Sequence, residues 1–246
     1  MRRTTVLLIT TALAAGLCLV AGNALADSGN GPPTLSFFSG GDGANAHWLA
    51  TSDQPPGDTD NQAIQLQTTN DAPTYSQGYA GILVHHVTGI PAATFPDSEF
   101  WVKTPTFTGG SLGSPRLVVE FQDAAGNFVG YGDLRPLTLS PTWQDVNDTS
   151  SYPNSGWDVM GGPCNFRYSV KWSTVQGCFA GDTTLSVFLV ADPYGITHLI
   201  DDITVDGKTF SSASDNGKGN NDPAGPTATT EPSLLPPFLP PLPSGS

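Results

Sequence analysis

A period of two in the order of apolar and polar residues constrains the fold of this chain more than any other feature of its sequence. Residues 64–68 alternate between apolar or hydroxyl-bearing side chains and glutamine, and residues 164–172 alternate without a break. Strands with this period have one dry face and one wet face. No segment has a convincing amphipathic helix, so we predict an all-β fold of about eight to ten strands, a two-sheet antiparallel β-sandwich or jelly roll. The other segments typical of strands are 81–88, 98–107, 116–122, 127–131, 183–191 and 196–205.

The composition supports this fold class and disfavours several kinds of partner. The 246 residues include 28 Gly and 22 Pro, which interrupt helices and favour turns between short strands. Only 13% of the residues are charged, and 9 Lys+Arg against 22 Asp+Glu give a formal net charge of −13. Because this charge repels phosphate groups, we expect no nucleic-acid partner and no attraction to anionic lipid.

The first 26 residues have the pattern of a secretory signal peptide. Arg2 and Arg3 precede a mostly apolar segment at 6–20, and residues 24–26 form a small-x-small cleavage site. We therefore expect a secreted, extracellular protein of bacterial type whose mature chain has no membrane span. The alternative is a membrane anchor, which requires about 20 apolar residues, whereas threonines and a glycine interrupt this segment.

The other end of the chain, residues 213–246, also differs from the rest in composition. It is rich in Pro, Gly, Ser and Thr, which do not support helix formation or strand pairing. We predict a disordered tail, and the alternative is an extended tail whose leucines dock on a cell-wall component or partner. A short linker at 27–33 and this tail flank the predicted domain at 34–212, which is long enough for one substantial core.

Two cysteines remain once a signal peptide containing Cys18 is removed. Cys164 and Cys178 are an even pair in an oxidising compartment, which predicts one disulfide bond. Closing a loop of about 15 residues stabilises a fold by roughly 3 kcal/mol on the chain-entropy model. Two cysteines do not complete a four-ligand zinc site, so a structural bridge is the favoured reading.

Three parts of the predicted domain have patterns that are similar to those of a known family. Residues 198–207 read HLIDDITVDG, which looks like the closing strand of jelly-roll carbohydrate-binding modules and related galactose-binding-like domains. The opening segment 37–41 leading to Trp48, and the strands at 100–102 and 117–121, are similar as well. The resemblance implies a sandwich fold, and it also implies a polysaccharide or cell-surface glycan as the partner.

The same resemblance implies a structural calcium ion. In such modules the first Asp of the closing strand, here Asp201, often binds calcium with a carboxylate near the start of the domain, for which Asp42 is the candidate. Strand parity agrees, because Asp201 shares a face with Leu199 and Ile203 and, without a bulge, points toward the interior. A buried carboxylate needs a cation or several donors, so the alternative is a hydrogen-bonded structural Asp.

The wet faces of the predicted strands carry the candidate ligand-binding residues. An aromatic ring presented among polar groups stacks on the C–H face of a sugar while its neighbours hydrogen-bond the hydroxyls. The alternative is that a loop or the second sheet covers the rings. The candidates are Trp101, Glu120, Gln122, Tyr131 and Trp143.

Two other functions remain open at this stage. A jelly-roll glycoside hydrolase uses two carboxylates across one face, and Glu99 and Glu120 are the candidate pair. No nucleophile or metalloprotease motif supports catalysis, so we expect a non-catalytic module. A structural or adhesive extracellular protein, with the sandwich displayed on the Pro-rich tail, fits the low charge and the predicted disulfide equally well.

Overall fold

The computed structural model describes residues 31–70, 77–106, 113–148, 155–164 and 167–215. The predicted signal peptide and the part of the predicted tail from residue 216 onward lie outside these residues. None of the described helices is long and apolar enough to span a membrane.

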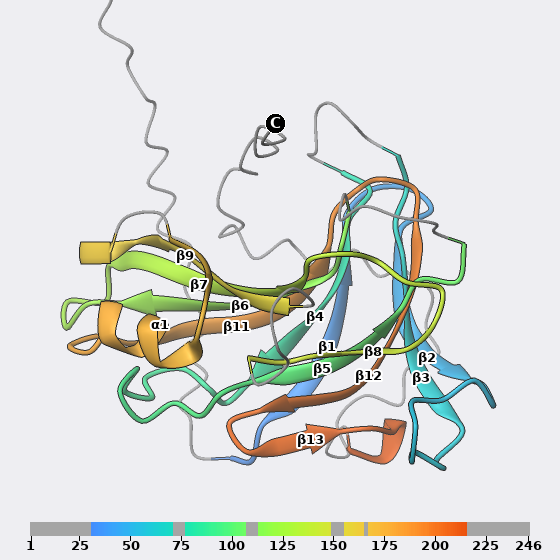
Figure 1. The fold of residues 1–246 in the computed structure, drawn as a ribbon, viewed down its shortest axis with the longest axis horizontal. Helices are drawn as coiled ribbons and strands as arrows, with labels where there is room; N and C mark the ends of the chain where they lie inside the picture. The colour runs from blue at the N-terminus through green and yellow to red at the C-terminus, as the bar shows by residue number, and fades with distance from the viewer. Residues whose placement is uncertain (1–30, 71–76, 107–112, 149–154, 165–166, 216–246) are drawn as a thin grey trace, which may run out of the picture.

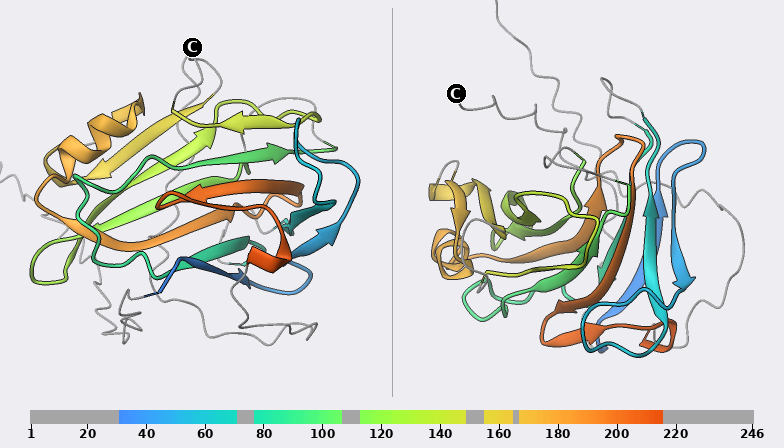
Figure 2. Two further views of the ribbon diagram at one scale, coloured as in Figure 1. Left: turned by 90° about the horizontal axis from the view of Figure 1, so that it is seen from below. Right: turned by 45° about the vertical axis from the view of Figure 1, so that its right-hand side comes forward.

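Two antiparallel sheets pack face to face, which confirms the predicted two-sheet β-sandwich (Figures 1 and 2). The seven-stranded sheet has the order β1 (Thr34–Ser39), β4 (Ala80–His85), β11 (Thr183–Ala191), β6 (Arg116–Gln122), β7 (Phe128–Pro136), β9 (Ser155–Gly161) and β10 (Arg167–Val170). The six-stranded sheet has the order β2 (Asn45–Ala50), β3 (Gln62–Gln67), β12 (Thr197–Val205), β5 (Glu99–Lys103) and β8 (Gln144–Val146), and β13 (Lys208–Phe210) pairs with β12.

The core lies between the sheets and is built from alternate residues of the strands. On β5, Phe100 and Val102 are fully buried against it, and on β6 the same is true of Leu117, Val119 and Phe121. Residues between them point to the outer faces of the sheets. The period of two in the sequence therefore identifies the inward and outward sides of these strands correctly.

The segment 164–172 differs from the single strand that its alternation predicts. Only Arg167–Val170 form a strand, while Gly162–Cys164 form the 3-10 turn η1 and Trp172–Cys178 form the helix α1. Tyr168 is 49% exposed, although alternation places it on the same side as Trp172. A seven-residue helix has only two turns, so it leaves too short a pattern to be recognised as amphipathic.

Helix α1 nevertheless places Trp172 in the core, as expected, at the β7 and β9 end of the molecule, far from β2 and β3 (Figures 1 and 2). The Trp172 ring packs on Trp157 and Phe121, with ring centroids 4.5 and 6.4 Å away, and its Nε1 donates to the Phe95 carbonyl at 2.9 Å. The predicted disulfide Cys164–Cys178 is present and joins η1 to the end of α1.

The described fold continues three residues past the predicted boundary at 212. Residues Ala213–Asp215 form the 3-10 turn η2, and the Ala213 N–H donates to Gln62 Oε1 at 2.9 Å. The Asp215 carboxylate accepts from the Ser211 and Ser212 N–H groups at 3.0 and 3.2 Å. The hydrogen bond to Gln62 places η2 beside the start of β3.

Candidate functional site

The predicted ligand-binding residues lie on two different outer faces. Glu120 on β6 and Tyr131 on β7 are direct cross-strand partners on the seven-stranded sheet, and Gln122 follows on the same side of β6. Trp101 is on β5 of the six-stranded sheet, and Trp143 immediately precedes β8, the strand that pairs with β5. The structure therefore brings Glu120 and Tyr131 together and places both tryptophans on the opposite side of the molecule.

The predicted catalytic pair is divided in the same way. Glu99 is exposed on β5, whereas Glu120 lies on β6 of the other sheet. Both residues point away from the core that separates the sheets, so they do not face one substrate. The prediction of a hydrolase that uses Glu99 and Glu120 as its carboxylate pair is therefore wrong. Alternation indicates which residues of a strand point outward, but it does not indicate which sheet the strand joins.

The outer side of β6, β7 and β9 carries a concentration of ionisable side chains, which we call the β6–β7–β9 face. Asp133 of β7 is the direct partner of Asp158 of β9, one row away from the Glu120–Tyr131 pair. These side chains are little exposed, at 7% for Asp133 and 1% for Glu120. The members of the face are Arg116, Glu120, Tyr131, Asp133, Arg135 and Asp158.

Two arginines pair with part of this negative charge. Arg116 Nη1 lies 2.5 Å from Asp192 Oδ2, and Arg116 Nε lies 4.0 Å from Asp133 Oδ2. Arg135 forms an ion pair with Asp158. On β7, Asp133 Oδ1 and Arg135 Nε are buried and have no hydrogen-bond partner among the described residues, and the same is true of Asp192 Oδ1. An acceptor and a donor on one strand are thus unsatisfied.

Burial also changes the protonation of this face. It raises the pKa of Glu120 to about 7, although a hydrogen bond from Ser186 opposes the rise. Burial likewise raises the pKa of Asp133 to about 6, with Arg116 acting against it. The pKa of Tyr131 is raised as well, mainly by burial. Shifted carboxyl pKa values gathered in one place are typical of functional sites.

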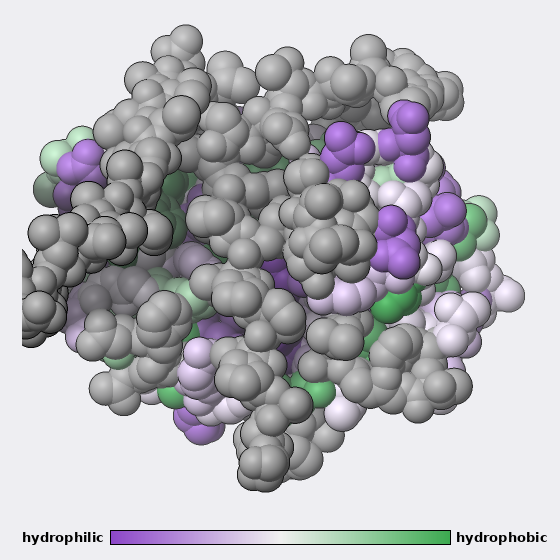
Figure 3. Space-filling model, turned by 90° about the horizontal axis from the view of Figure 1, so that it is seen from above, coloured by the Kyte–Doolittle hydropathy of each residue, from purple (hydrophilic) through white to green (hydrophobic). Residues whose placement is uncertain are grey.

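Apolar and aromatic side chains border the ionisable ones on the same outer side of the sheet. They form a second cluster that is separate from the main core, and the Tyr131 hydroxyl donates to Met160 Sδ at 2.7 Å. Seen from above, the visible surface of the described residues is a mosaic of hydrophilic and apolar areas (Figure 3). The buried members of the cluster are Tyr79, Val118, Tyr131, Phe188 and Val190.

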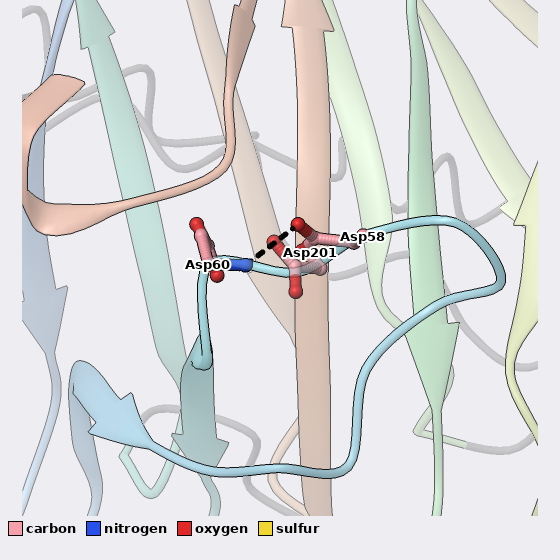
Figure 4. A group of neighbouring side chains, drawn as sticks. All are labelled: Asp58, Asp60 and Asp201. Carbon is pink, nitrogen blue, oxygen red and sulfur yellow. Dashed lines mark hydrogen bonds between the residues drawn. The ribbon is translucent and has the colours of Figure 1, made fainter.

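A second group of carboxylates lies against the six-stranded sheet. Asp58 and Asp60 belong to the loop between β2 and β3, and Asp201 belongs to β12 (Figure 4). One oxygen from each carboxylate lies within 4.8 Å of the others. Asp42, the predicted partner of Asp201, is exposed in the turn between β1 and β2 and is not a member of this group.

The burial of Asp201 has a different cause from the one that parity predicts. Asp202 has a φ of 45° and the pairing of β12 with β5 shifts register between Asp201 and Thr204, so a bulge reverses the alternation. Ile200 and Ile203 face the core, while Asp201 faces outward beside Trp101. Asp201 is still 0% exposed. The expectation of a buried carboxylate is correct, and the inward direction, which is expected only without a bulge, does not apply because the bulge is present.

The oxygen atoms of this group are suited to a hard cation. The Oδ1 atoms of Asp58, Asp60 and Asp201 accept backbone N–H groups at 3.1, 2.8 and 2.9 Å. The Oδ2 atoms of all three are buried and have no partner within the described part of the chain. Calcium takes oxygen ligands at about 2.3–2.6 Å, so ligands on opposite sides of the ion are about 5 Å apart, and the three carboxylates fit that size.

Burial raises the pKa of Asp201 to about 8, and the neighbouring carboxylates add to the rise. A proton or a cation is therefore needed to relieve this site near neutral pH. The residues that alternation did not identify, Asp58 and Asp60, have a local signal. They form an Asp-x-Asp sequence between Gly57 and Asn61, and oxygen-bearing residues at alternate positions beside a glycine are typical of calcium loops.

No protein-family model matches the chain, and no curated protein is similar to it in sequence. Solved structures similar to it include carbohydrate-binding modules. One is the family 11 module of Clostridium thermocellum in complex with a β-1,3-1,4-mixed-linked tetrasaccharide, at 12% identity and a TM-score of 0.38. The match covers 72% of this chain and 90% of that one.

Two further structures are similar at the same level. The xylan-binding domain CBM22-1 of Paenibacillus barcinonensis has 12% identity and a TM-score of 0.38, with 73% of this chain and 88% of that chain covered. An arabinose-bound α-L-arabinofuranosidase of family GH51 has 13% identity and a TM-score of 0.39 over 72% of this chain. The chain spans only 24% of that enzyme. The ligands named here belong to those proteins.

Proposed function

We propose that this domain is a secreted, non-catalytic module that binds a carbohydrate through the β6–β7–β9 face. The observation that carries the proposal is the pair of unsatisfied atoms on β7, Asp133 Oδ1 and Arg135 Nε. A buried polar atom without a partner costs about 1–3 kcal/mol. A sugar hydroxyl both donates and accepts hydrogen bonds, so the hydroxyls of a sugar are chemically suited to both atoms.

The surroundings of these two atoms support a neutral polyol ligand. The pKa of about 7 leaves Glu120 partly protonated at neutral pH, so its carboxyl also both donates and accepts. The two arginines are already paired with Asp192 and Asp158, so among the described side chains of this face no cation is left unpaired for an acidic sugar. Tyr131 adds an aromatic ring beside the polar groups.

The proposal is tested by affinity electrophoresis of the full-length protein in gels containing a panel of neutral polysaccharides. We expect at least one polysaccharide to retard the wild-type protein, and Asp133→Ala to weaken that affinity by about tenfold to a hundredfold, the usual value of a hydrogen bond to a charged group. Asp133→Asn preserves the shape and should have a smaller effect. Thermal melting confirms that each variant is folded.

Glu99→Gln is the matched control, because it removes one carboxylate charge from the other sheet. It should bind like the wild type. Unchanged binding by Asp133→Ala overturns the proposed site. Loss of binding in Trp101→Ala or Trp143→Ala instead places the ligand on the six-stranded sheet, and release of reducing sugar from any polysaccharide in the panel overturns the non-catalytic assignment.

We also propose that Asp58, Asp60 and Asp201 hold a structural calcium ion. The three buried oxygens without partners support this proposal, and the ion would neutralise carboxylates that otherwise repel each other. An ion that binds only the folded state raises the melting temperature. Calcium should therefore raise the midpoint of the wild-type protein relative to a chelator, and Asp201→Asn should remove this difference. Equal midpoints in calcium and chelator would contradict the proposal.

A further inference from the structure

The loop between β2 and β3, residues 51–61, contacts two separate places on the six-stranded sheet. Its far part supplies Asp58 and Asp60 to the carboxylate group with Asp201. Its near part supplies Asp53, whose Oδ1 accepts the Trp143 indole N–H at 3.1 Å and whose Oδ2 pairs with Lys103. One loop thus joins the proposed cation site to Trp143 and Lys103.

Hydrogen bonds within the loop connect its two parts. The Asp58 N–H donates to the Pro55 carbonyl at 3.2 Å, and Thr51 N–H donates to the Asn61 carbonyl at 3.0 Å across the base of the loop. Gln54 Nε2 donates to the carbonyls of Thr51 and Gln62 at 3.1 and 3.0 Å. These hydrogen bonds connect the part of the loop that carries Asp58 to the part that carries Asp53.

The contacts of Asp53 are too weak to hold the loop in place unaided. The side chain of Asp53 is 46% exposed, and exposed ion pairs contribute about 0–1 kcal/mol. Against this, three carboxylates gathered in one small site repel each other when no cation is present. Whether the loop stays against the six-stranded sheet therefore depends on whether a cation occupies the carboxylate site.

We propose that a divalent cation bound by Asp58, Asp60 and Asp201 fixes the 51–61 loop and thereby positions Trp143 and Lys103 through Asp53. The inference rests on the proposed cation site but not on the carbohydrate-binding proposal. Trp101 lies within the same surface, because it is the cross-strand partner of Asp201 and is two residues from Lys103 on β5. The cation would order one continuous polar and aromatic surface of the six-stranded sheet.

The experiment follows the indole N–H signals of the full-length protein by ¹⁵N NMR during titration with calcium chloride. The sequence has five tryptophans, and Trp143→Phe identifies the Trp143 signal by its absence. In the wild type we expect calcium to shift this signal and to slow its exchange with solvent by at least about tenfold, since the Asp53 contact opens less often. Calorimetry measures calcium binding independently.

Two variants separate the cation site from the coupling. Asp201→Asn should lose both calcium binding and the response of Trp143. Asp53→Asn should bind calcium with unchanged affinity but lose the slowing of exchange at Trp143. Its matched control, Asp182→Asn, changes a carboxylate outside the loop and should retain the wild-type response.

The outcomes distinguish the two proposals. Absence of calcium binding in the wild type overturns the cation site and the coupling together. Calcium binding without a change at Trp143, or an unchanged Trp143 response in Asp53→Asn, overturns the coupling and leaves the cation site intact. Neither outcome bears on binding by the β6–β7–β9 face, which is on the other sheet.

Discussion

Ser186 of β11 donates its hydroxyl hydrogen bond to Glu120 of β6, and the two residues are direct cross-strand partners. This hydrogen bond favours the charged form of Glu120, yet burial outweighs it and raises the pKa of the carboxyl from 4.5 to about 7. The outer face of the seven-stranded sheet therefore contains an acid whose protonation depends on folding.

The first prediction concerns the free energy of unfolding between pH 4.5 and 7. In this range the folded state holds a proton on Glu120 that the unfolded state has released, so this group makes the protein less stable as the pH rises. Over the whole range, the raised pKa of Glu120 lowers the free energy of unfolding by about 3 kcal/mol. Glu120→Gln should remove it, so urea unfolding of the variant should gain stability relative to wild type as pH rises. A constant difference across this range would contradict the assignment.

His198 should act in the opposite direction. It is fully buried, and burial lowers its pKa from 6.5 to about 4, while its Nδ1 is hydrogen-bonded to Thr104 Oγ1 at 2.9 Å. Between pH 6.5 and 4, His198 is protonated in the unfolded state but neutral in the folded state. The free energy of unfolding therefore decreases as the pH falls toward 4.

His198→Gln should remove this acid sensitivity, although the lost packing lowers its stability at every pH. The measurement is urea unfolding at pH 4.5, 5.5 and 7. Because the raised carboxyl pKa values of Glu120, Asp133 and Asp201 oppose His198 over much of this range, the stability of His198→Gln should fall more steeply with rising pH than that of the wild type. An acid slope that persists in His198→Gln would assign the effect to other groups.

A third prediction concerns the bulge in β12. Asp202 has a φ of 45°, a region that Asn, Asp and Gly enter more easily than β-branched residues. Asp202→Val should therefore destabilise the fold by roughly 1–2 kcal/mol, and Asp202→Asn should be tolerated. Thr204→Val, on the same strand without a positive φ, is the control. Equal stability of the two valine variants in urea would argue against a strained bulge.

A fourth prediction concerns the Cys164–Cys178 bond, whose cysteines are 14 residues apart. Replacing both cysteines with serine should lower the free energy of unfolding by about 3 kcal/mol, because the unfolded chain regains the freedom that the bridge removes. The same loss should appear in the wild-type protein after reduction. If reduction has no effect on the melting midpoint, α1 is held by its aromatic packing alone.

A fifth prediction uses two glycines with contrasting surroundings. A Cβ on Gly81 would overlap Phe38 Cζ and would lie 2.6 Å from the Leu189 carbonyl oxygen, which is a backbone atom and moves only at a high energetic cost. Gly81→Ala should cost about 1–3 kcal/mol in stability. A Cβ on Gly177 of α1 would meet open space, so Gly177→Ala should be neutral or stabilising by up to about 1 kcal/mol. Similar midpoints for the two variants would contradict the close packing at Gly81.

Local patterns determined much of this fold. The period of two correctly identified β5, β6, β11 and β12 and the inward positions of β5 and β6, because side-chain direction within a strand depends only on neighbouring residues. The same argument correctly placed Glu120 on an outer face. The pairing of Cys164 with Cys178 followed once Cys18 was assigned to the predicted signal peptide.

Tertiary structure decided which of these local features meet. Glu99 and Glu120 both occupy outward positions of predicted strands, yet strand pairing placed them on opposite sheets. The bulge at Asp202 reversed the parity of Asp201, and the 51–61 loop, far from β12 in sequence, supplied the two carboxylates that lie beside Asp201. Pairing between distant strands and the path of a loop depend on contacts across the whole core, which a repeating pattern of neighbouring residues does not encode.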